Sequence, residues 1–176
     1  PMAETTLGEE NTGPRLGDVI LSELHYHPAE PPAGSTITET ELEFVELLNR
    51  TSAPVFVGNW RLDAGVDFTF AEQMTIPGGG VIVIVRFDPA DAIRAEEFRT
   101  IHAIEDSVPL LGPYGGRLEN LGERVVLARP DEPPADEPLF VPYVVVDEVR
   151  YDDQGPWPPE AAGAGQSLHR TATDAF

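Results

Sequence analysis

The chain has 176 residues, enough for one domain with a hydrophobic core, and 41 % of them are hydrophobic, which excludes wholesale disorder. Acidic residues outnumber basic ones 31 to 11, giving a net charge of −20, so we expect no nucleic-acid partner, because phosphate affinity comes from Lys and Arg. There is no Cys, which excludes disulfides, thiolate metal sites and thiol nucleophiles. No stretch reaches the roughly 20 apolar residues of a membrane span, so we expect no membrane insertion.

The chain begins with a segment, residues 1–16, that we interpret as flexible. It has neither the basic start nor the apolar stretch of a signal peptide. Residues 171–176 look like the start of a following segment or tail. We therefore expect one domain over residues 17–170, cut or processed from a longer protein.

Short β-branched runs between Pro and Gly predict the strands. The 18 Pro and 16 Gly punctuate these runs in the way typical of a β-sandwich or barrel. Seven strands are predicted, at 19–26, 42–49, 55–62, 67–70 (extended by Thr75 and Ile76), 81–87, 123–128 and 143–151. The run at 81–87 is almost continuously apolar, which indicates a buried strand.

One stretch has helical character. Asp88 is a candidate N-cap, Pro89 suits the first turn, and residues 92–99 would then form two or three turns. We expect this helix to pack across one edge of the sandwich.

Two Trp and several other aromatic residues are the candidate core. Trp60, predicted on a strand after Gly58, would fill the space between two sheets, and Trp157 would cover one end of the sandwich. A sugar- or partner-binding platform is the alternative for Trp157. The remaining core residues we expect are Phe44, Phe68, Phe70 and Tyr151.

A set of segments in fixed order resembles the bacterial lamin tail domain. The segments are 19–28, 43–49, 57–62, 66–70, 76–80, 116–123, 146–153, 156–158 and 163–168. The resemblance covers roughly residues 17–170. It implies an all-β, immunoglobulin-like β-sandwich, here with one short helix.

The same resemblance implies a function. Bacterial lamin tail domains occur inside large secreted or surface proteins and are regarded as non-catalytic association or attachment modules. We therefore expect an extracellular or cell-surface location and a protein or glycan partner, bound by a strand edge and by the loops 29–35, 103–116 and 130–138. The alternative is a calcium- or carbohydrate-binding domain that targets a neighbouring enzyme.

Glu23, His25 and His27 alternate along one predicted strand, so all three would share a face. Two imidazoles and a carboxylate are ligands for zinc or another transition metal. The competing interpretation is a polar outer face, with Leu24 and Tyr26 pointing inward.

Carboxylates could also hold calcium, although no EF-hand loop is present. The candidates are Asp147, Asp152 and Asp153, and the Asp152–Asp153 pair beside a turn motivates this hypothesis. We expect no other cofactor.

Glu43 and Glu46 are three residues apart, which places them on opposite faces of a strand. One of them would be semi-buried and would need a partner. The candidate partners are Arg61, Arg124 and the Tyr151 hydroxyl.

Catalytic motifs are weak. The sequence has no Gly-x-Ser-x-Gly elbow, and Ser167 and His169 lie in a Gly-rich tail. The sequence predicts a non-enzymatic protein.

Overall fold

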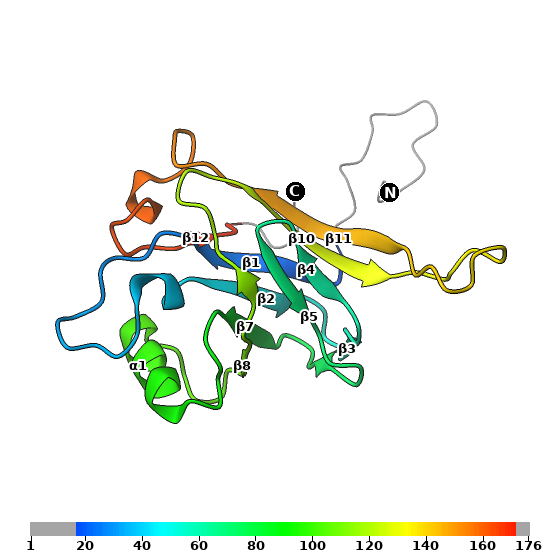
Figure 1. Cartoon of the computed structure of the whole chain (residues 1–176), viewed down its shortest axis with the longest axis horizontal. Helices are drawn as coiled ribbons and strands as arrows, with labels where there is room; N and C mark the ends of the chain where they lie inside the picture. The colour runs from blue at the N-terminus through cyan, green and yellow to red at the C-terminus, as the bar shows by residue number, and fades with distance from the viewer. Residues whose placement is uncertain (1–16, 172–176) are drawn as a thin grey trace.

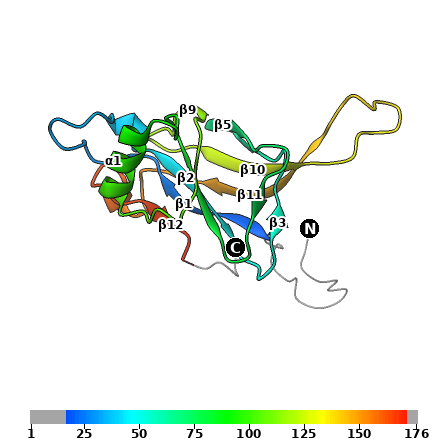
Figure 2. The ribbon, with the colours of Figure 1, turned by 90° about the horizontal axis from the view of Figure 1, so that it is seen from below.

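A computed structural model of the chain describes residues 17–171. The predictions for residues 1–16 and 172–176 lie outside this range. The described part is an all-β, immunoglobulin-like sandwich of two five-stranded sheets with one α-helix, as the sequence predicted. Figures 1 and 2 show the two layers and the helix at one end.

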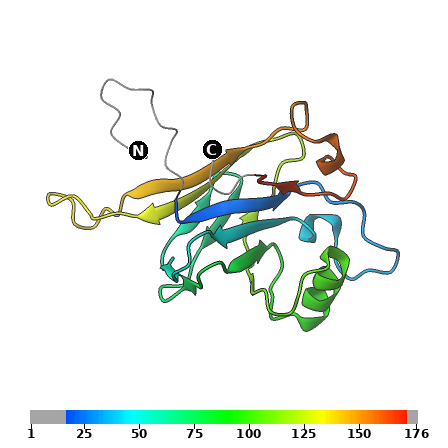
Figure 3. The same cartoon turned by 180° about the vertical axis from the view of Figure 1, so that it is seen from behind.

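The first sheet has the strand order β12-β1-β2-β7-β8. Its strands are β1 (Val19–His25), β2 (Phe44–Asn49), β7 (Val81–Val85), β8 (Leu110–Leu111) and β12 (Leu168–His169). Neighbours are antiparallel except β7 and β8, which are parallel. Figure 3 shows β12 beside β1 at one margin of this sheet.

The second sheet has the order β11-β10-β4-β5-β9. Its strands are β4 (Arg61–Asp63), β5 (Val66–Thr69), β9 (Gly115–Gly116), β10 (Arg124–Pro130) and β11 (Tyr143–Arg150). A separate two-stranded sheet pairs β3 (Val55–Phe56) with β6 (Thr75–Ile76). Two short 3-10 helices cover Glu39–Glu41 and Pro159–Ala161.

The predicted strand at 55–62 is in fact two strands joined by a turn. Asn59 has φ 60°, in the left-handed region, and Trp60 N donates to Val57 O at 3.1 Å. The turn sends β3 to the small sheet and β4 to the second large sheet. Strands β8, β9 and β12 were not predicted, because two residues are too few to show the alternation of apolar and polar side chains that indicates a strand.

The main core lies between the two sheets. Leu21, Leu47 and Ile84 contribute from the first sheet, and Leu62 and Leu127 contribute from the second. At the end near the C-terminal segment, the rings of Tyr26 and Tyr151 pack with centroids 4.5 Å apart.

The predicted aromatic core residues do not all lie in this space. Phe70 and Tyr151 are buried there, while Phe68 and Trp157 are half-buried against its margin. Trp60 does not fill the space between the sheets, because the turn before β4 leaves it half-buried at the margin. Phe44 belongs to a second cluster, under the helix.

Helix α1 (Ala92–His102) is longer than predicted and begins after a different cap. Asp91, not Asp88, is the N-cap, because its side chain accepts from Ile93 N and Arg94 N, both at 3.2 Å. The Asp88 side chain instead accepts from Ala90 N in the preceding turn.

The helix covers the outer face of the first sheet rather than an edge of the sandwich. Phe98 packs on Phe44 of β2 and on Phe87, in a cluster with Val83 and Val85 of β7. This explains the unbroken apolar run of β7, since Ile82 and Ile84 face the main core while Val83 and Val85 face the helix.

A buried ion pair joins the two sheets at the margin where β12 stops short. Strand β12 pairs only with Glu23 and Leu24, so the outward amide and carbonyl of Leu21 have no strand beside them. Asp147 of β11 accepts from Leu21 N at 2.8 Å and from Arg170 Nη2 at 2.8 Å. Arg170 Nε donates to Leu21 O at 3.1 Å.

We call Leu21, Asp147 and Arg170 the seam clamp. A β-bulge occurs at this point in each sheet. In β1 it lies between Leu21 and Glu23, and in β11 it lies at Val146, which has no paired residue on β10. Asp147 is only 2 % exposed. Burial raises the pKa of its carboxyl, and the hydrogen bond from Leu21 N and the charge of Arg170 oppose that rise.

Breaking the seam clamp should destabilise the fold. We expect Asp147→Ala to lower the free energy of unfolding by about 3 kcal/mol, because it leaves Leu21 N without this acceptor and the Arg170 guanidinium without its carboxylate. Urea denaturation measures this loss. A double-mutant cycle with Arg170→Ala should show a coupling free energy, and a coupling near zero would contradict the clamp.

The matched control is an exposed ion pair on the same strand. Glu148 of β11 pairs with Arg124, and both side chains are partly exposed. Glu148→Ala should therefore cost less than about 1 kcal/mol.

Candidate functional site

The three residues of the predicted metal triad point to different surroundings. His25 is buried under α1, with ring centroids 5.4 Å from Phe44 and 5.0 Å from His102. Strand β1 ends at His25, so His27 lies beyond it, with Nε2 3.9 Å from Glu39 Oε1. Among residues 17–171, no group of three or more His, Cys, Asp or Glu is arranged to hold a metal ion.

Glu23 instead faces a different set of side chains. It lies opposite Glu46 of β2 on one side and opposite His169 of β12 on the other. Its carboxylate accepts from Ser167 Oγ and lies 3.1 Å from His169 Nε2. Leu24 and Tyr26 point into the main core, as the competing interpretation predicted.

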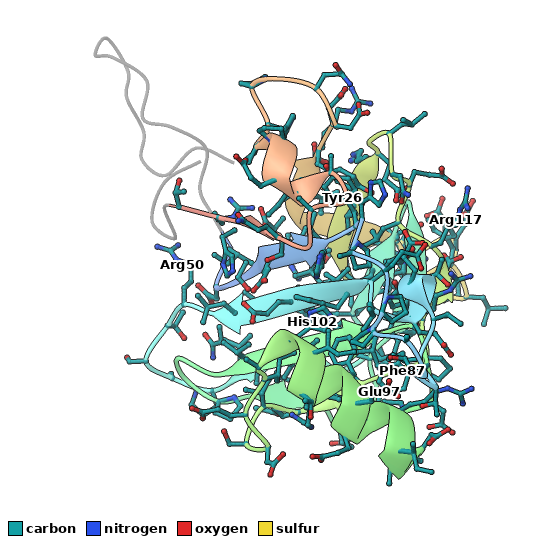
Figure 4. The ribbon with its side chains drawn as sticks, turned by 90° about the vertical axis from the view of Figure 1, so that its left-hand side faces the viewer. Tyr26, Arg50, Phe87, Glu97, His102 and Arg117 are labelled. Atoms are coloured by element: carbon teal, nitrogen blue, oxygen red, sulfur yellow. The ribbon has the colours of Figure 1, made fainter. Side chains whose placement is uncertain are left out.

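Glu23 and the polar residues around it line a pocket of about 360 Å³ between the C-terminal end of α1 and residues 165–169. We call it the His–Glu pocket; its charged and polar walls include Glu23, His25, Glu46, His102, Ser167 and His169. Figure 4 looks from the α1 side and shows His102 where the helix faces the sheet. Three of the four His residues of the chain, His25, His102 and His169, line this pocket. Of these three, only His25 had been predicted as a metal ligand.

The electrostatics of the pocket are those of half-buried carboxylates beside neutral imidazoles. Burial raises the pKa of Glu46, nearby Glu23 raises it further, and a 2.7 Å hydrogen bond from Ser22 Oγ opposes the rise. Burial also lowers the pKa of both His25 and His102 to about 4. Both imidazoles are therefore neutral at pH 7.

Ser167 and His169 do not form a nucleophile and its base. Both bind the Glu23 carboxylate, which stands between them. An acyl-transfer site needs the imidazole between the hydroxyl and the carboxylate. This order supports no serine-nucleophile chemistry.

The predicted calcium ligands are dispersed. Asp147 is held in the seam clamp, and Asp152 and Asp153 lie in the loop after β11. Asp152 Oδ1 accepts from Gln154 N at 2.9 Å and closes that loop locally. Calcium binding stays a prediction, and no arrangement of the described residues favours it.

Glu43 is buried, but its predicted partners were wrong. Its carboxylate accepts from Tyr114 Oη at 3.2 Å and from Leu118 N at 2.9 Å, so it fastens the segment around β9 to the sandwich. The three partners expected for it bind elsewhere: Arg61 pairs with Asp63, Arg124 with Glu148, and Tyr151 donates to Glu119 O and Glu123 Oε1.

A second feature is the long hairpin between β10 and β11. It projects beyond the sandwich in both Figure 1 and Figure 2. We call residues 131–142 the arm; its base is closed by Asp131 N, which donates to Pro142 O at 2.9 Å. On its returning side, just before Pro142, Leu139 is 98 % exposed, Phe140 57 % and Val141 45 %. The predicted contact loop 130–138 ends just before this apolar group.

Strand β11, which continues from the arm, has no neighbouring strand on one side among residues 17–171. It is an outermost strand of its sheet, and Val144 and Val145 on it are exposed. An uncovered strand of this kind offers unpaired amides and carbonyls to another chain.

A family model for the lamin tail domain matches residues 13–130. The chain belongs to the lamin tail domain family. The match includes the strands up to β10, whereas the arm, β11 and β12 lie after it, although β11 and β12 are integral to the two sheets of this lamin tail domain. No curated protein matches the chain significantly. Its one described α-helix is too short and polar to cross a membrane.

The buried imidazole of His25 should make this lamin tail domain sensitive to acid. Its folded pKa of about 4 lies below the ordinary value of 6.5. The stability that neutral His25 contributes is thus present above pH 6.5 and is lost as the pH falls toward 4, by roughly 3 kcal/mol. We expect His25→Phe to lose less stability than the unmodified chain between pH 7 and pH 4.5, measured by urea denaturation.

His27→Phe is the matched control, because His27 lies outside the buried cluster. It should leave the pH dependence of the free energy of unfolding unchanged. Identical pH profiles for His25→Phe and the unmodified chain would show that His25 carries no such cost.

Proposed function

We propose that this lamin tail domain is a non-catalytic association module that binds a protein partner through the arm and the adjoining strand β11. By family resemblance, it would serve in a larger extracellular or surface-attached bacterial protein. The observation that carries the proposal is the exposed apolar group of Leu139, Phe140 and Val141 on a projecting hairpin. Large apolar side chains gathered on an exposed surface mark interaction sites.

The exposed acidic residues of the arm indicate which surface a partner would present. Asp131, Glu132, Asp136 and Glu137 are all exposed in the arm, and the chain as a whole carries a charge of −20. A complementary surface would therefore be an apolar groove with a basic rim. Strand β11 adds the possibility of main-chain pairing with a strand of the same partner.

A protein is favoured over a glycan at the arm. Phe140 is the single aromatic residue of the arm, and its exposed neighbours Leu139 and Val141 are aliphatic, which suits an apolar groove on a protein. The half-buried Trp157 lies against the core rather than on the arm. Carbohydrate and calcium binding stay as the alternative function.

Site-specific photo-crosslinking tests the proposal. A photoreactive amino acid at position 140 should capture one protein from the cells that make this chain, identified by mass spectrometry. The same label at Ile93, an exposed apolar residue on α1, is the matched control and should capture none of that protein. Equal capture at both positions, or none at 140, would contradict the proposal.

Substitution of Leu139 and Phe140 separates binding to the partner from folding of the domain. Leu139→Ser with Phe140→Ser should abolish competition with the labelled chain for the captured protein. It should shift the melting temperature by no more than about 2 °C, because Leu139 is almost fully exposed and Phe140 is more than half exposed. Full competition by this double variant would remove the arm from the interface.

A further inference from the structure

We propose that the His–Glu pocket binds an organic cation, a guanidinium or ammonium group on a small molecule or on a side chain. This site is separate from the arm and does not rest on the function proposed above. It lies on the outer face of the first sheet, where α1 stops and residues 165–169 return to β1.

The pocket carries uncompensated negative charge. Glu23 and Glu46 are cross-strand neighbours on β1 and β2, and like charges placed directly opposite destabilise a sheet. Among the residues that the structure describes, no Arg lines the pocket. In Figure 4, Arg50 and Arg117 both lie well away from His102. Within residues 17–171, the basic side chain that pairs with Glu23 is the exposed His169.

The end of α1 adds to this negative potential. His102 is the last residue of an 11-residue helix, and Ile101, His102 and Ile104 all line the pocket. The C-terminal end of a helix carries partial negative charge from its free carbonyls, which favours a cation within the last turn.

His25 supplies an independent indication of a polar ligand. The residue is only 3 % exposed and forms part of the pocket wall, and neither of its ring nitrogens has a hydrogen-bond partner within the described part of the chain. Buried polar groups normally have a partner. A ligand with N–H groups would bring a donor to the lone pair of this neutral imidazole after a small movement of the ring.

The size of the pocket and the arrangement of its polar side chains favour an organic group over a metal ion. A pocket of about 360 Å³ is in the range of sites for small molecules. The described residues provide no cluster of three metal ligands. A guanidinium carries five N–H donors in a planar fork, so it can satisfy two carboxylates at once.

Calorimetric titration of the full chain with agmatine, a small guanidinium compound, tests the proposal. Binding should be detected with agmatine and lost with n-pentylurea, which has a similar length but carries neither the guanidinium nor the ammonium charge. A capped Gly-Arg-Gly peptide and its citrulline counterpart test the side-chain source. Binding of either guanidinium probe supports the cation class, and which probe binds more tightly indicates the source.

Charge removal should weaken binding specifically. Glu23→Gln with Glu46→Gln should lower the affinity about tenfold or more, while Glu72→Gln, an exposed glutamate outside the pocket, should leave it within about twofold. A thermal melt of each variant verifies folding.

A second variant leaves both carboxylates intact. Gln166 is exposed at the pocket wall, so Gln166→Arg should place a tethered guanidinium there and block agmatine, whereas the uncharged Gln166→Met should not. Failure of both guanidinium probes to bind, or binding unaffected by Gln166→Arg, would overturn the proposal. So would binding of Zn²⁺ at this pocket with no response to either probe.

Discussion

The two sheets of this domain depend on a buried charge at their shared margin. Asp147 reaches from β11 to the amide of Leu21, and Arg170 takes the neighbouring carbonyl and the same carboxylate. Without these contacts, the margin of β1 beyond the two-residue strand β12 would bury polar backbone groups with no partner. The clamp also explains why the fold needs residues so near the end of the described chain.

The outer face of the first sheet has two kinds of surface. Toward β7, the face is apolar and α1 covers it, with Phe98 at the centre of the contact. Toward β12, the strands carry Glu46, Glu23 and His169 across the sheet, and these side chains open into a pocket. One sheet therefore has a structural half and a half that is free to bind.

Local patterns predicted the architecture and failed on the site. The apolar run at 81–87 and the ordered family segments gave the sandwich, because strand alternation and turn residues act over a few positions. The seam clamp could not be predicted, because Leu21 and Asp147 come together only when the two sheets pack. The same holds for His102, which reaches His25 through a helix, so the predicted triad lacked its true neighbours. The prediction that Trp60 fills the space between the sheets was wrong, because Asn59, in the left-handed conformation, turns the chain just before it.

The arm has a consequence for how such a domain can diversify. No residue from 131 to 142 belongs to either buried cluster, and a single backbone hydrogen bond closes its base. Lengthening a surface hairpin costs little conformational entropy, since the closure penalty grows only slowly with loop length. Relatives with the same sandwich can therefore acquire new partners by exchanging this one protrusion, while selection for a stable fold acts on a separate set of residues.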